Sequence, residues 1–362
     1  MRITFLLPDH SAVPAGGPKV VFEYANRLAE KGHDLCVVMP NRIIDRRTAL
    51  ASLADRIKYY ARKHGWRGGY APCAWFEVDP AVRLRWVPSL AERHIPDADI
   101  LVATFWQTAE VAAKYSPAKG IKHHLIQGDE RGWDESVRER VRRTWRLPFQ
   151  RIVVSRWLQD VVADEAGGAQ YIPNGLDFIT FGIDAPIEGR NSRAIIMQYH
   201  RHIIKGSHVG IAALCQAKSI DSRFSAVLFG TLPAPRDLPY WMTYHHNPPQ
   251  KLLRQLYNGA AIYVGPGISE GWGLTGCEAA QCGAALCVTD IGGHREYAVK
   301  GRTAVLCPPG DSDALARSII GLARGRKRRI ELAQAANKFV QRFDWGRSVN
   351  AMERLFAACR TP

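Results

Sequence analysis

A short stretch at residues 269–290, SEGWGLTGCEAAQCGAALCVTD, brings two glutamates together with closely spaced glycines. Gly271 and Gly273 would let a ligand approach the backbone closely. Glu270 and Glu278 carry carboxylates, which are poor ligands for phosphate but good acceptors for the hydroxyls of a sugar or a ribose. The spacing of the two glutamates is weak evidence by itself. An exposed loop glutamate followed by a glutamate inside a helix is the ordinary alternative.

The elements around this stretch would hold it at the edge of a sheet. A buried strand is predicted at 261–264, and a helix is predicted over 274–282. The free N–H groups and the positive dipole end of that helix suit a phosphate. In parallel sheets, ligands bind at the carboxyl ends of the strands. The loop between these two elements would therefore offer N–H donors to a diphosphate and carboxylates to hydroxyls.

Buried apolar strands alternate with helices along the whole chain, in two series, which indicates an α/β fold with two parallel sheets. In the first series, strands are predicted at 2–7, 34–39, 83–87, 100–103, 123–126 and 151–154, and helices at 19–31, 107–115, 134–146 and 155–166. In the second, strands are predicted at 194–197, 225–229, 261–264 and 285–288, and helices at 205–217, 249–258, 274–282 and 311–323. The polar segment 183–192 would join the two series, and a last helix is predicted at 344–358.

Composition narrows the class of protein. The 362 residues are 46% hydrophobic and 23% charged, as expected for two globular domains, and no apolar run is long enough for a transmembrane helix. Eight cysteines include no Cys-x-x-Cys pair, so we expect free thiols in a reducing cytoplasm and no zinc. A net charge of +15 indicates an anionic partner, although a solvating surface is the alternative.

The stretch EGWGLTGCEAAQCGAALCVTDIGGHREY resembles the signature of glycosyltransferase family 4 in the GT-B superfamily. Further matches follow the family's order along nearly the whole chain: GGPKVVFEYANRLAEKGHDLCVV, SRWLQDVV, YIPNGLDFITF, LCPPGDSDALARSI and FDWGRSVNAMERLF. The resemblance implies two Rossmann-like parallel-sheet domains facing a central cleft. Residues 1–185 would form an acceptor-side domain, and 186–343 a nucleotide-sugar-binding domain. Residues 344–362 would form a helix that packs back on the first domain.

The resemblance also implies roles for individual residues. Glu270 would accept hydroxyls of the donor sugar, and Glu278 would accept the ribose hydroxyls of the nucleotide. Lys205 matches the family lysine that contacts the diphosphate. The expected donor site is completed by backbone groups of the loop and the helix start, from Gly271, Trp272, Gly273 and Leu274.

The expected phosphate clamp departs from the family pattern. In the family, an arginine that follows a glycine usually stands five residues before the lysine that Lys205 matches. Here position 200 is histidine, and Arg201 stands next to it. Either Arg201 serves after a small shift of the loop, or His200 donates instead, and both belong to the predicted donor site. The candidate catalytic residues are Glu270, Lys205 and Arg201, together with Asp129 in the first domain.

The first domain contributes a second set of candidates. Gly16 and Gly17 match the family loop that closes over the donor phosphate and frames the acceptor site. Gln127, Asp129 and Glu130 end a predicted strand and resemble a subgroup with Gln-Gly-x-Glu at this place. They would lie near the reacting carbon or the acceptor, but none is assigned as a general base. The alternative is a strand end with no chemical part.

The implied activity is transfer of a hexose from a nucleotide diphosphate to a glycan or lipid-linked acceptor, with retention of configuration. No metal or cofactor is expected, and Asp97-Ala98-Asp99 is interpreted as a turn before a buried strand. The alternative function is a catalytically silent subunit that binds sugar nucleotides or polysaccharide. Nucleic-acid binding is disfavoured, because the basic residues are scattered and match no known motif.

Residues 42–70 are basic and carry an apolar stripe at helical spacing with aromatic residues nearby. Such a helix suits an anionic membrane surface, and an ordinary surface helix is the alternative. We therefore expect a cytoplasmic enzyme with peripheral contact to the inner membrane face.

Overall fold

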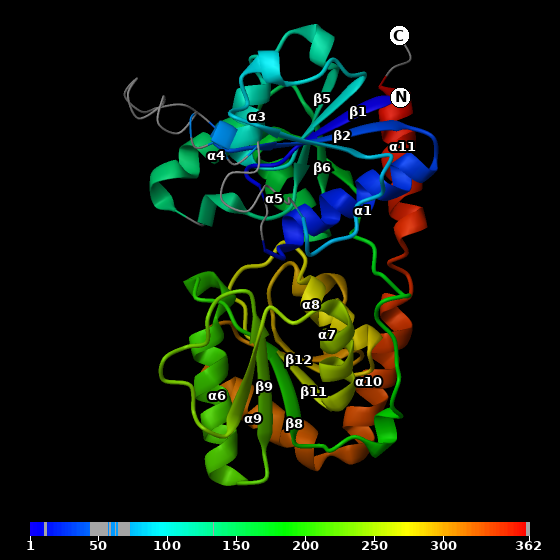
Figure 1. Ribbon diagram of the computed structural model, residues 1–362. Coiled ribbons are helices and arrows are strands. Elements are labelled where there is room, and N and C mark those ends of the chain that lie inside the picture. Colours follow the sequence, from blue (N-terminus) through cyan, green and yellow to red (C-terminus); the bar gives the residue numbers. More distant parts are fainter. Residues whose placement is uncertain are drawn as a thin grey trace. The chain divides into compact units, whose positions relative to one another are not determined.

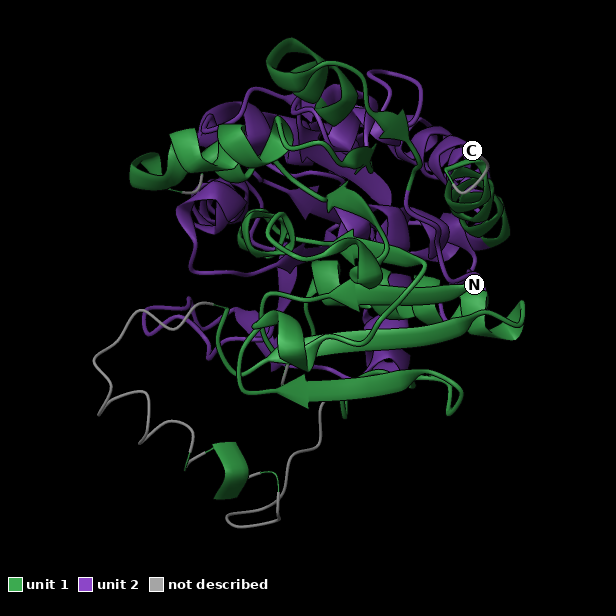
Figure 2. Ribbon diagram, turned by 90° about the horizontal axis from the view of Figure 1, so that it is seen from above, with its two compact units in different colours: residues 1–154, 158–173, 346–362 green, residues 155–157, 174–345 purple. Residues whose placement is uncertain are grey.

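The computed structural model of the chain describes residues 1–10, 13–43, 57, 59–61, 63, 73–132 and 134–359 (Figure 1). The chain divides into two compact units (Figure 2). Unit 1 comprises residues 1–154, 158–173 and 346–362, and unit 2 comprises residues 155–157 and 174–345. The divisions thus fall at 173–174 and 345–346, whereas the resemblance places domain boundaries at 185–186 and 343–344.

Unit 1 is built on a parallel sheet of seven strands in the order β3-β2-β1-β4-β5-β6-β7. The strands are β1 (Arg2–Leu6), β2 (Asp34–Pro40), β3 (Arg83–Val87), β4 (Ile100–Ala103), β5 (Ile121–Ile126), β6 (Gln150–Val153) and β7 (Gln170–Tyr171). The helices of its first 173 residues are α1 (Gly16–Glu30), α3 (Trp106–Ala112), α4 (Arg138–Trp145) and α5 (Arg156–Ala166). The inner strands are buried on both faces, as continuous apolar runs predict.

Unit 2 repeats this plan with six parallel strands in the order β10-β9-β8-β11-β12-β13. They are β8 (Ala194–Gln198), β9 (Ser225–Gly230), β10 (Met242–His246), β11 (Ile262–Gly265), β12 (Ala285–Thr289) and β13 (Ala304–Cys307). The helices are α6 (Ser207–Ile220), α7 (Gln250–Gly259), α8 (Leu274–Gln281), α9 (Ser312–Arg324) and α10 (Arg326–Val340).

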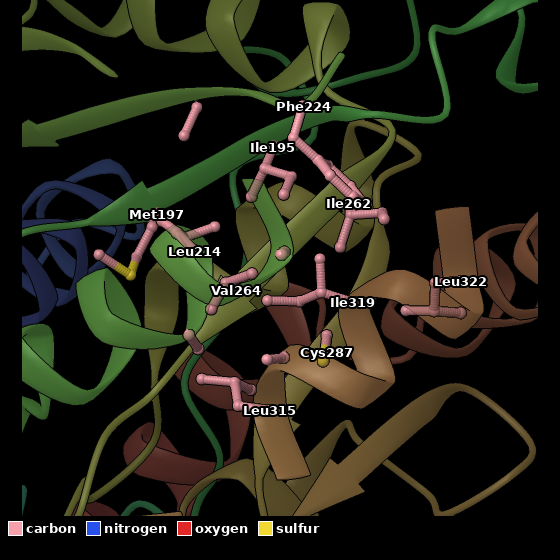
Figure 3. Close-up of a cluster of buried hydrophobic side chains, with 14 of the residues drawn as sticks. Ile195, Met197, Leu214, Phe224, Ile262, Val264, Cys287, Leu315, Ile319 and Leu322 are labelled. Atoms are coloured by element: carbon pink, nitrogen blue, oxygen red, sulfur yellow. The ribbon is translucent and has the colours of Figure 1, made fainter. Parts of the chain in front are cut away.

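The core of unit 2 fixes the strands that carry the candidate site. Met197 of β8 and Val264 of β11 pack with Leu214 of α6 and with Leu315 and Ile319 of α9 (Figure 3). All five residues are fully buried from solvent. Burial of one such side chain contributes about 1.5–3 kcal/mol to the stability of the folded protein. Packing against this core therefore holds the ends of β8 and β11 at fixed positions.

The last helix, α11 (Trp345–Ala358), packs on unit 1 although it follows unit 2 in the chain. Phe356 is fully buried, and its ring meets the ring of His123 at 4.8 Å. Glu353 forms ion pairs with Lys31 at 2.8 Å and with His33 at 2.9 Å. These contacts join the C-terminal helix to β5 and to the α1–β2 turn.

The structure confirms the predicted α/β class and most of the predicted elements, with some differences. The first helix begins at Gly16, not at residue 19, so Gly16 and Gly17 form its first turn. The sequence did not predict β7, β10, β13 or α10. Asp97 and Asp99 lie directly before β4, where they form ion pairs with Lys119 and Arg2, and the chain there has a bend at residue 99 and no assigned turn.

Several other expectations can be compared with the described residues. All eight cysteines are free. Among the described residues, no helix is both long and apolar enough to cross a membrane. Most of the basic segment 42–70 lies outside the described residues. Within that segment, Tyr59 is buried and donates a hydrogen bond to the carbonyl of Trp86 at 2.7 Å.

Candidate functional site

The candidate site of unit 2 lies where the strand order of its sheet reverses. From β8 the chain moves outward to β9 and β10, and then returns to β11 on the other side of β8. The loops that follow β8 and β11 therefore leave the sheet at its carboxyl edge in opposite directions. Such a topological switch point is where open α/β sheets bind ligands. The predicted residues Lys205 and Glu270 lie on these two loops.

An ion pair joins the two loops. Lys205 Nζ lies 2.8 Å from each carboxylate oxygen of Glu270. The side chain of Lys205 is 33% exposed and that of Glu270 is 17% exposed, so ligands can still reach both groups. An ammonium group, which can bind phosphate, and a carboxylate, which can accept hydroxyl groups, therefore lie side by side.

Backbone contacts hold the same two loops in register. The N–H groups of Ile268 and Ser269 both donate to the carbonyl of Ile204, at 2.7 and 3.2 Å. Gly206 adopts a left-handed φ of +62°, and a Cβ at this position would lie 1.9 Å from the carbonyl oxygen of Pro266. Glycine is therefore required for the loop of Lys205 to approach the loop of Glu270.

Helix α8 begins directly after the Glu270 loop. Gly273 precedes it with φ +89°, no side chain caps its N-terminus, and its first turn carries no acidic residue. The free N–H groups and the dipole of this end suit an anionic ligand. The ring of Trp272 is buried and packs edge-on against Phe343, with centroids 4.8 Å apart. At Gly271, Trp272, Gly273 and Leu274, the backbone is thus the part available to a ligand.

Glu278 lies on α8, one turn after the helix start. It is 6% exposed, and one of its carboxylate oxygens accepts a hydrogen bond from the hydroxyl of Tyr257 at 3.3 Å. Burial and the neighbouring Glu278 raise the pKa of Tyr257 well above its usual value, so the phenol stays protonated and donates. Tyr257, on α7, is a positioning residue for Glu278 that the sequence analysis did not identify.

His200 and Arg201 follow β8 and precede Lys205. The backbone N–H of His202 donates to His200 Nδ1 at 3.0 Å. Burial, with the nearby Lys205 and His202, lowers the pKa of His200, so the ring is neutral near pH 7 and carries its proton on Nε2. His200 thus presents an N–H donor. Arg201 is exposed, and no ion pair with another described residue is formed.

A third loop, after β12, supplies a residue that the sequence analysis did not propose. His294 is 3% exposed, and its Nδ1 lies 2.9 Å from the carbonyl oxygen of Thr289. Gly273 and Gly293 bring the Glu270 loop against this loop, because a Cβ on Gly293 would lie 2.3 Å from the carbonyl oxygen of Glu270. The signal in the sequence is a histidine directly after two glycines at the end of a buried strand.

In unit 1, two of the predicted residues meet at the carboxyl edge of the sheet. Gln127 follows β5, and its Nε2 lies 3.4 Å from the carbonyl oxygen of Gly17 in the first turn of α1. A Cβ on Gly17 would lie 3.5 Å from the amide of Gln127. Gly16 and Gly17 form the N-terminus of α1, and its N-cap residue, Ala15, makes no side-chain capping hydrogen bond.

The other two unit 1 candidates are engaged within the protein. Asp129 accepts two hydrogen bonds from the guanidinium of Arg131, at 2.8 and 2.9 Å, and Arg131 also pairs with Glu165. Glu130 is 4% exposed and accepts a hydrogen bond from the N–H of Trp106 at 2.9 Å, at the start of α3. Burial raises the pKa of Glu130 to about 8. Glu130 therefore contacts the start of α3 with a carboxyl group that is mostly protonated near pH 7, while Asp129 is engaged by Arg131.

No group of three or more His, Cys, Asp or Glu side chains that could hold a metal ion occurs in the described part of the chain.

Comparison with known proteins places these residues in a family context. Residues 241–339 match the family described as Glycosyl transferases group 1. This range includes Glu270, Glu278 and His294.

Relatives and solved structures extend the similarity to the rest of the chain. Phosphatidyl-myo-inositol mannosyltransferase of Mycolicibacterium smegmatis is 24% identical over 376 residues, which cover 95% of this chain and 90% of that protein. D-inositol 3-phosphate glycosyltransferase of Nocardiopsis dassonvillei is 29% identical over 117 residues, or 32% of this chain and 27% of that protein. Anabaena Alr3699/HepE in complex with UDP and glucose has a TM-score of 0.76 at 17% identity and covers 99% of this chain and 100% of its own.

Sucrose-phosphate synthase from Thermosynechococcus elongatus is similar in fold, with a TM-score of 0.75 at 17% identity over 99% of this chain and 98% of its own. At this identity, the solved structures establish the fold. The activity follows from the family match and from the full-length relative. The chain is therefore a glycosyltransferase of the GT-B fold.

Proposed function

We propose that this glycosyltransferase takes a hexose from a nucleotide diphosphate held at the carboxyl edge of unit 2. We further propose that it transfers the hexose, with retention of configuration, to a glycan or lipid-linked acceptor held by unit 1. This is the reaction of glycosyltransferase family 4, which the motifs resemble. The observation that carries the proposal is the Lys205–Glu270 pair, with both distances 2.8 Å, across the switch point and beside the uncapped start of α8.

The chemistry of this edge matches the charge that builds up in the reaction. The bond between the anomeric carbon and the diphosphate breaks, and the acceptor hydroxyl oxygen bonds to that carbon on the same face. The proton of the hydroxyl passes to the departing diphosphate oxygen, so no protein base is needed. Lys205, the Nε2–H of His200 and the N-terminus of α8 stabilise the negative charge on the leaving group. Arg201 adds a further cation from the same loop.

Hydroxyl acceptors on the same edge would hold the sugar and the nucleotide. Glu270 binds hydroxyls of the transferred sugar while Lys205 moves to the diphosphate. Glu278, oriented by Tyr257, binds the ribose hydroxyls. The similarity to a protein named phosphatidyl-myo-inositol mannosyltransferase favours mannose as the sugar and a lipid as the acceptor. The fold similarity to Anabaena Alr3699/HepE, whose structure was solved in complex with UDP-glucose, makes UDP-glucose a second donor to test.

The direct test is donor turnover by the full-length protein. UDP-, GDP-, ADP- and dTDP-sugars are incubated with a lipid extract, and the products are followed by chromatography and by NMR of the anomeric proton. We expect one donor to be consumed, with an α-linked product from an α-linked donor. A β-linked product would contradict retention. Failure of every donor to be consumed or bound would contradict the function.

Two further parts of the proposal have tests of their own. If cations of the protein stabilise the leaving diphosphate, activity persists in excess EDTA, and abolition of activity that Mg²⁺ or Mn²⁺ restores would contradict this. Peripheral contact with the membrane predicts sedimentation with vesicles containing anionic lipid and release at high salt. Equal sedimentation with neutral vesicles would contradict an electrostatic contact.

A further inference from the structure

We propose that His294 accepts a hydrogen bond from a hydroxyl of the transferred sugar and so helps to select the donor. This inference rests on the proposed function and deepens it, because it names a specificity residue on the loop after β12. Glu270 is the hydroxyl acceptor that the family resemblance supplies. His294 would be a second acceptor, uncharged and on a different strand.

The hydrogen bonds of His294 fix its tautomer. The carbonyl oxygen of Thr289 can only accept, so the ring nitrogen 2.9 Å away, Nδ1, must carry the proton. The hydroxyl of Thr289 is turned to the carbonyl of Gly267, at 2.5 Å, which leaves its oxygen facing the same Nδ1–H at 3.3 Å. In the neutral ring, Nε2 is then a bare acceptor.

Nε2 has no hydrogen-bond partner among the described residues, yet it reaches solvent. No hydrogen bond to it is formed by any residue that the structure describes. The inaccessible polar atoms without partners include the hydroxyl of Tyr297 but not His294 Nε2, so the exposed 3% of His294 includes this atom. A ligand can therefore supply the missing donor.

The surroundings place Nε2 at the donor site. It would lie 3.4 Å from a Cβ built on Gly273, the residue that precedes α8. A Cβ on the adjacent Gly293 would lie 2.3 Å from the carbonyl oxygen of Glu270, and Glu270 is paired with Lys205, so the loop of His294 packs against the loop that holds this pair. Burial is the main cause that lowers the pKa of His294, which keeps the ring neutral near pH 7.

A hydroxyl fits this acceptor and a phosphate oxygen does not. A diphosphate offers only acceptors at neutral pH, so its oxygens would repel the lone pair of Nε2. His200, on the loop after β8, has the opposite tautomer, because its Nδ1 accepts from the N–H of His202 and its Nε2 donates. The two histidines are thus suited to different parts of the donor, His200 to the diphosphate and His294 to the sugar.

The test uses two variants of the full-length protein that differ in one property. In His294→Asn, the side-chain amide can still donate to the carbonyl of Thr289, but no atom takes the place of Nε2. In His294→Gln, the longer side chain can bring its amide oxygen to that place. Calorimetry measures binding of UDP, GDP, UDP-glucose and GDP-mannose, and of analogues of both sugar nucleotides deoxygenated at C2, C3, C4 or C6.

We expect His294→Asn to bind the sugar nucleotide about tenfold more weakly and to bind the free nucleoside diphosphate as the wild type does. One deoxy analogue should bind the wild type about tenfold more weakly than the intact sugar nucleotide does, but it should bind His294→Asn no more weakly than the intact sugar nucleotide binds that variant. The reason is that removal of the hydroxyl and removal of Nε2 abolish the same hydrogen bond. His294→Gln should recover most of the affinity. Recovery would separate the loss of an acceptor from damage to the loop.

Three results would overturn the inference while leaving the proposed function intact. One is unchanged affinity in His294→Asn, and another is an equal loss for UDP and UDP-glucose, which would assign His294 to the diphosphate. The third is full discrimination of every deoxy analogue by His294→Asn. Absence of binding by the wild type to all the sugar nucleotides would overturn both the inference and the proposed function.

Discussion

Lys205 and Glu270 neutralise each other in the free protein, and this pairing decides what each substitution does. A phosphate group near Lys205 would compete with Glu270 for the ammonium, while the sugar hydroxyls would compete for the carboxylate. If the proposed donor site is correct, donor binding would exchange one charge-assisted contact for two new ones, and the ion pair would keep both groups oriented before the donor binds.

Substitution of Lys205 should act mainly on turnover, and substitution of Glu278 mainly on donor binding. Lys205→Ala removes a cation from the departing diphosphate, so we expect kcat to fall about 10²- to 10³-fold. Glu278→Ala removes an acceptor of ribose hydroxyls, so we expect the donor KM to rise about tenfold with little change in kcat. Steady-state kinetics measure both effects.

Arg223→Ala serves as the charge control, because Arg223 is exposed and pairs only with Asp221 among the described residues at the α6–β9 turn. It should leave both constants unchanged. Unchanged kinetics in both site variants would refute the assignment of this edge as the donor site.

Glu130 predicts a specific dependence of stability on pH. Its pKa is raised by burial to about 8, against an ordinary value of 4.5. Between these two values the unfolded chain has lost the proton and the folded chain still holds it, so the free energy of unfolding falls as pH rises. Below pH 4.5 the group contributes no such loss, and above pH 8 the loss is complete.

Glu130→Gln should remove this dependence, because an amide oxygen can still accept from the N–H of Trp106 and no longer ionises. We expect a higher melting temperature than wild type at pH 8 and a smaller difference at pH 5. Thermal unfolding across this range measures it. A difference that grows toward acid would show that Glu130 is stabilised as the carboxylate.

At the scale of elements, the loop after β8 depends on a glycine at 206. Alanine there would need φ +62° and would place its Cβ 1.9 Å from the carbonyl oxygen of Pro266. The left-handed backbone alone costs about 1–2 kcal/mol, and the collision must push the two loops apart. We expect Gly206→Ala to lose more than about 2 kcal/mol of stability and most donor affinity.

Gly167→Ala is the matched control, because Gly167 has φ +82° and nothing lies within 4 Å of a Cβ there. Gly167→Ala should lose only the free energy that the left-handed backbone conformation costs an alanine, and it should leave donor binding intact. Chemical denaturation and calorimetry distinguish the two variants. Equal behaviour of Gly206→Ala and Gly167→Ala would show that contact with Pro266 does not hold the site.

The element scale also shows what local patterns can predict. The buried strands and the stretch 269–290 were predictable, because continuous apolar runs and the glycines beside Glu270 are local signals. β10 was not, since MTYHH alternates polar residues on an outer strand of the sheet and has no apolar run. α10 begins with RKRR, a basic run that favours an exposed loop. Only the structure shows that alanines later in this helix are buried.

The residues of the candidate site could likewise be predicted only where a local sequence motif marks them. Lys205, Glu270 and Glu278 could be found because motifs mark them. Tyr257 was not found, since its role depends on a contact with Glu278 on another helix. His294 carries only a weak local signal, and its place beside the Glu270 loop depends on the close approach of Gly293 to Glu270 in the fold. Burial of Glu130 was missed for the same reason, because only the folded chain brings the N–H of Trp106 to its carboxylate.

At the scale of the whole molecule, the chain closes unit 1 with its last helix. Phe356 of α11 is fully buried against His123 of β5. Phe356→Ala should destabilise unit 1 by about 3–5 kcal/mol, because a large cavity opens in its core. Hydrogen exchange should rise in β5 and α1 and stay unchanged in β12, which belongs to unit 2.

Arg354→Ala, on the exposed face of the same helix, should change neither unit. Faster exchange in β12 that equals the change in β5 would show that the units unfold together. It would then contradict a separate role for α11 in unit 1.

The claim that unit 2 holds the nucleotide-sugar donor is tested most directly by hydrogen exchange of the full-length protein with and without donor. UDP-glucose and GDP-mannose serve as ligands, each with its nucleoside diphosphate as a control. We predict slower exchange at the loop after β8 (199–206), at the loop after β11 (266–273) and at the start of α8. Protection confined to other segments, or no protection with either donor, would contradict the claim.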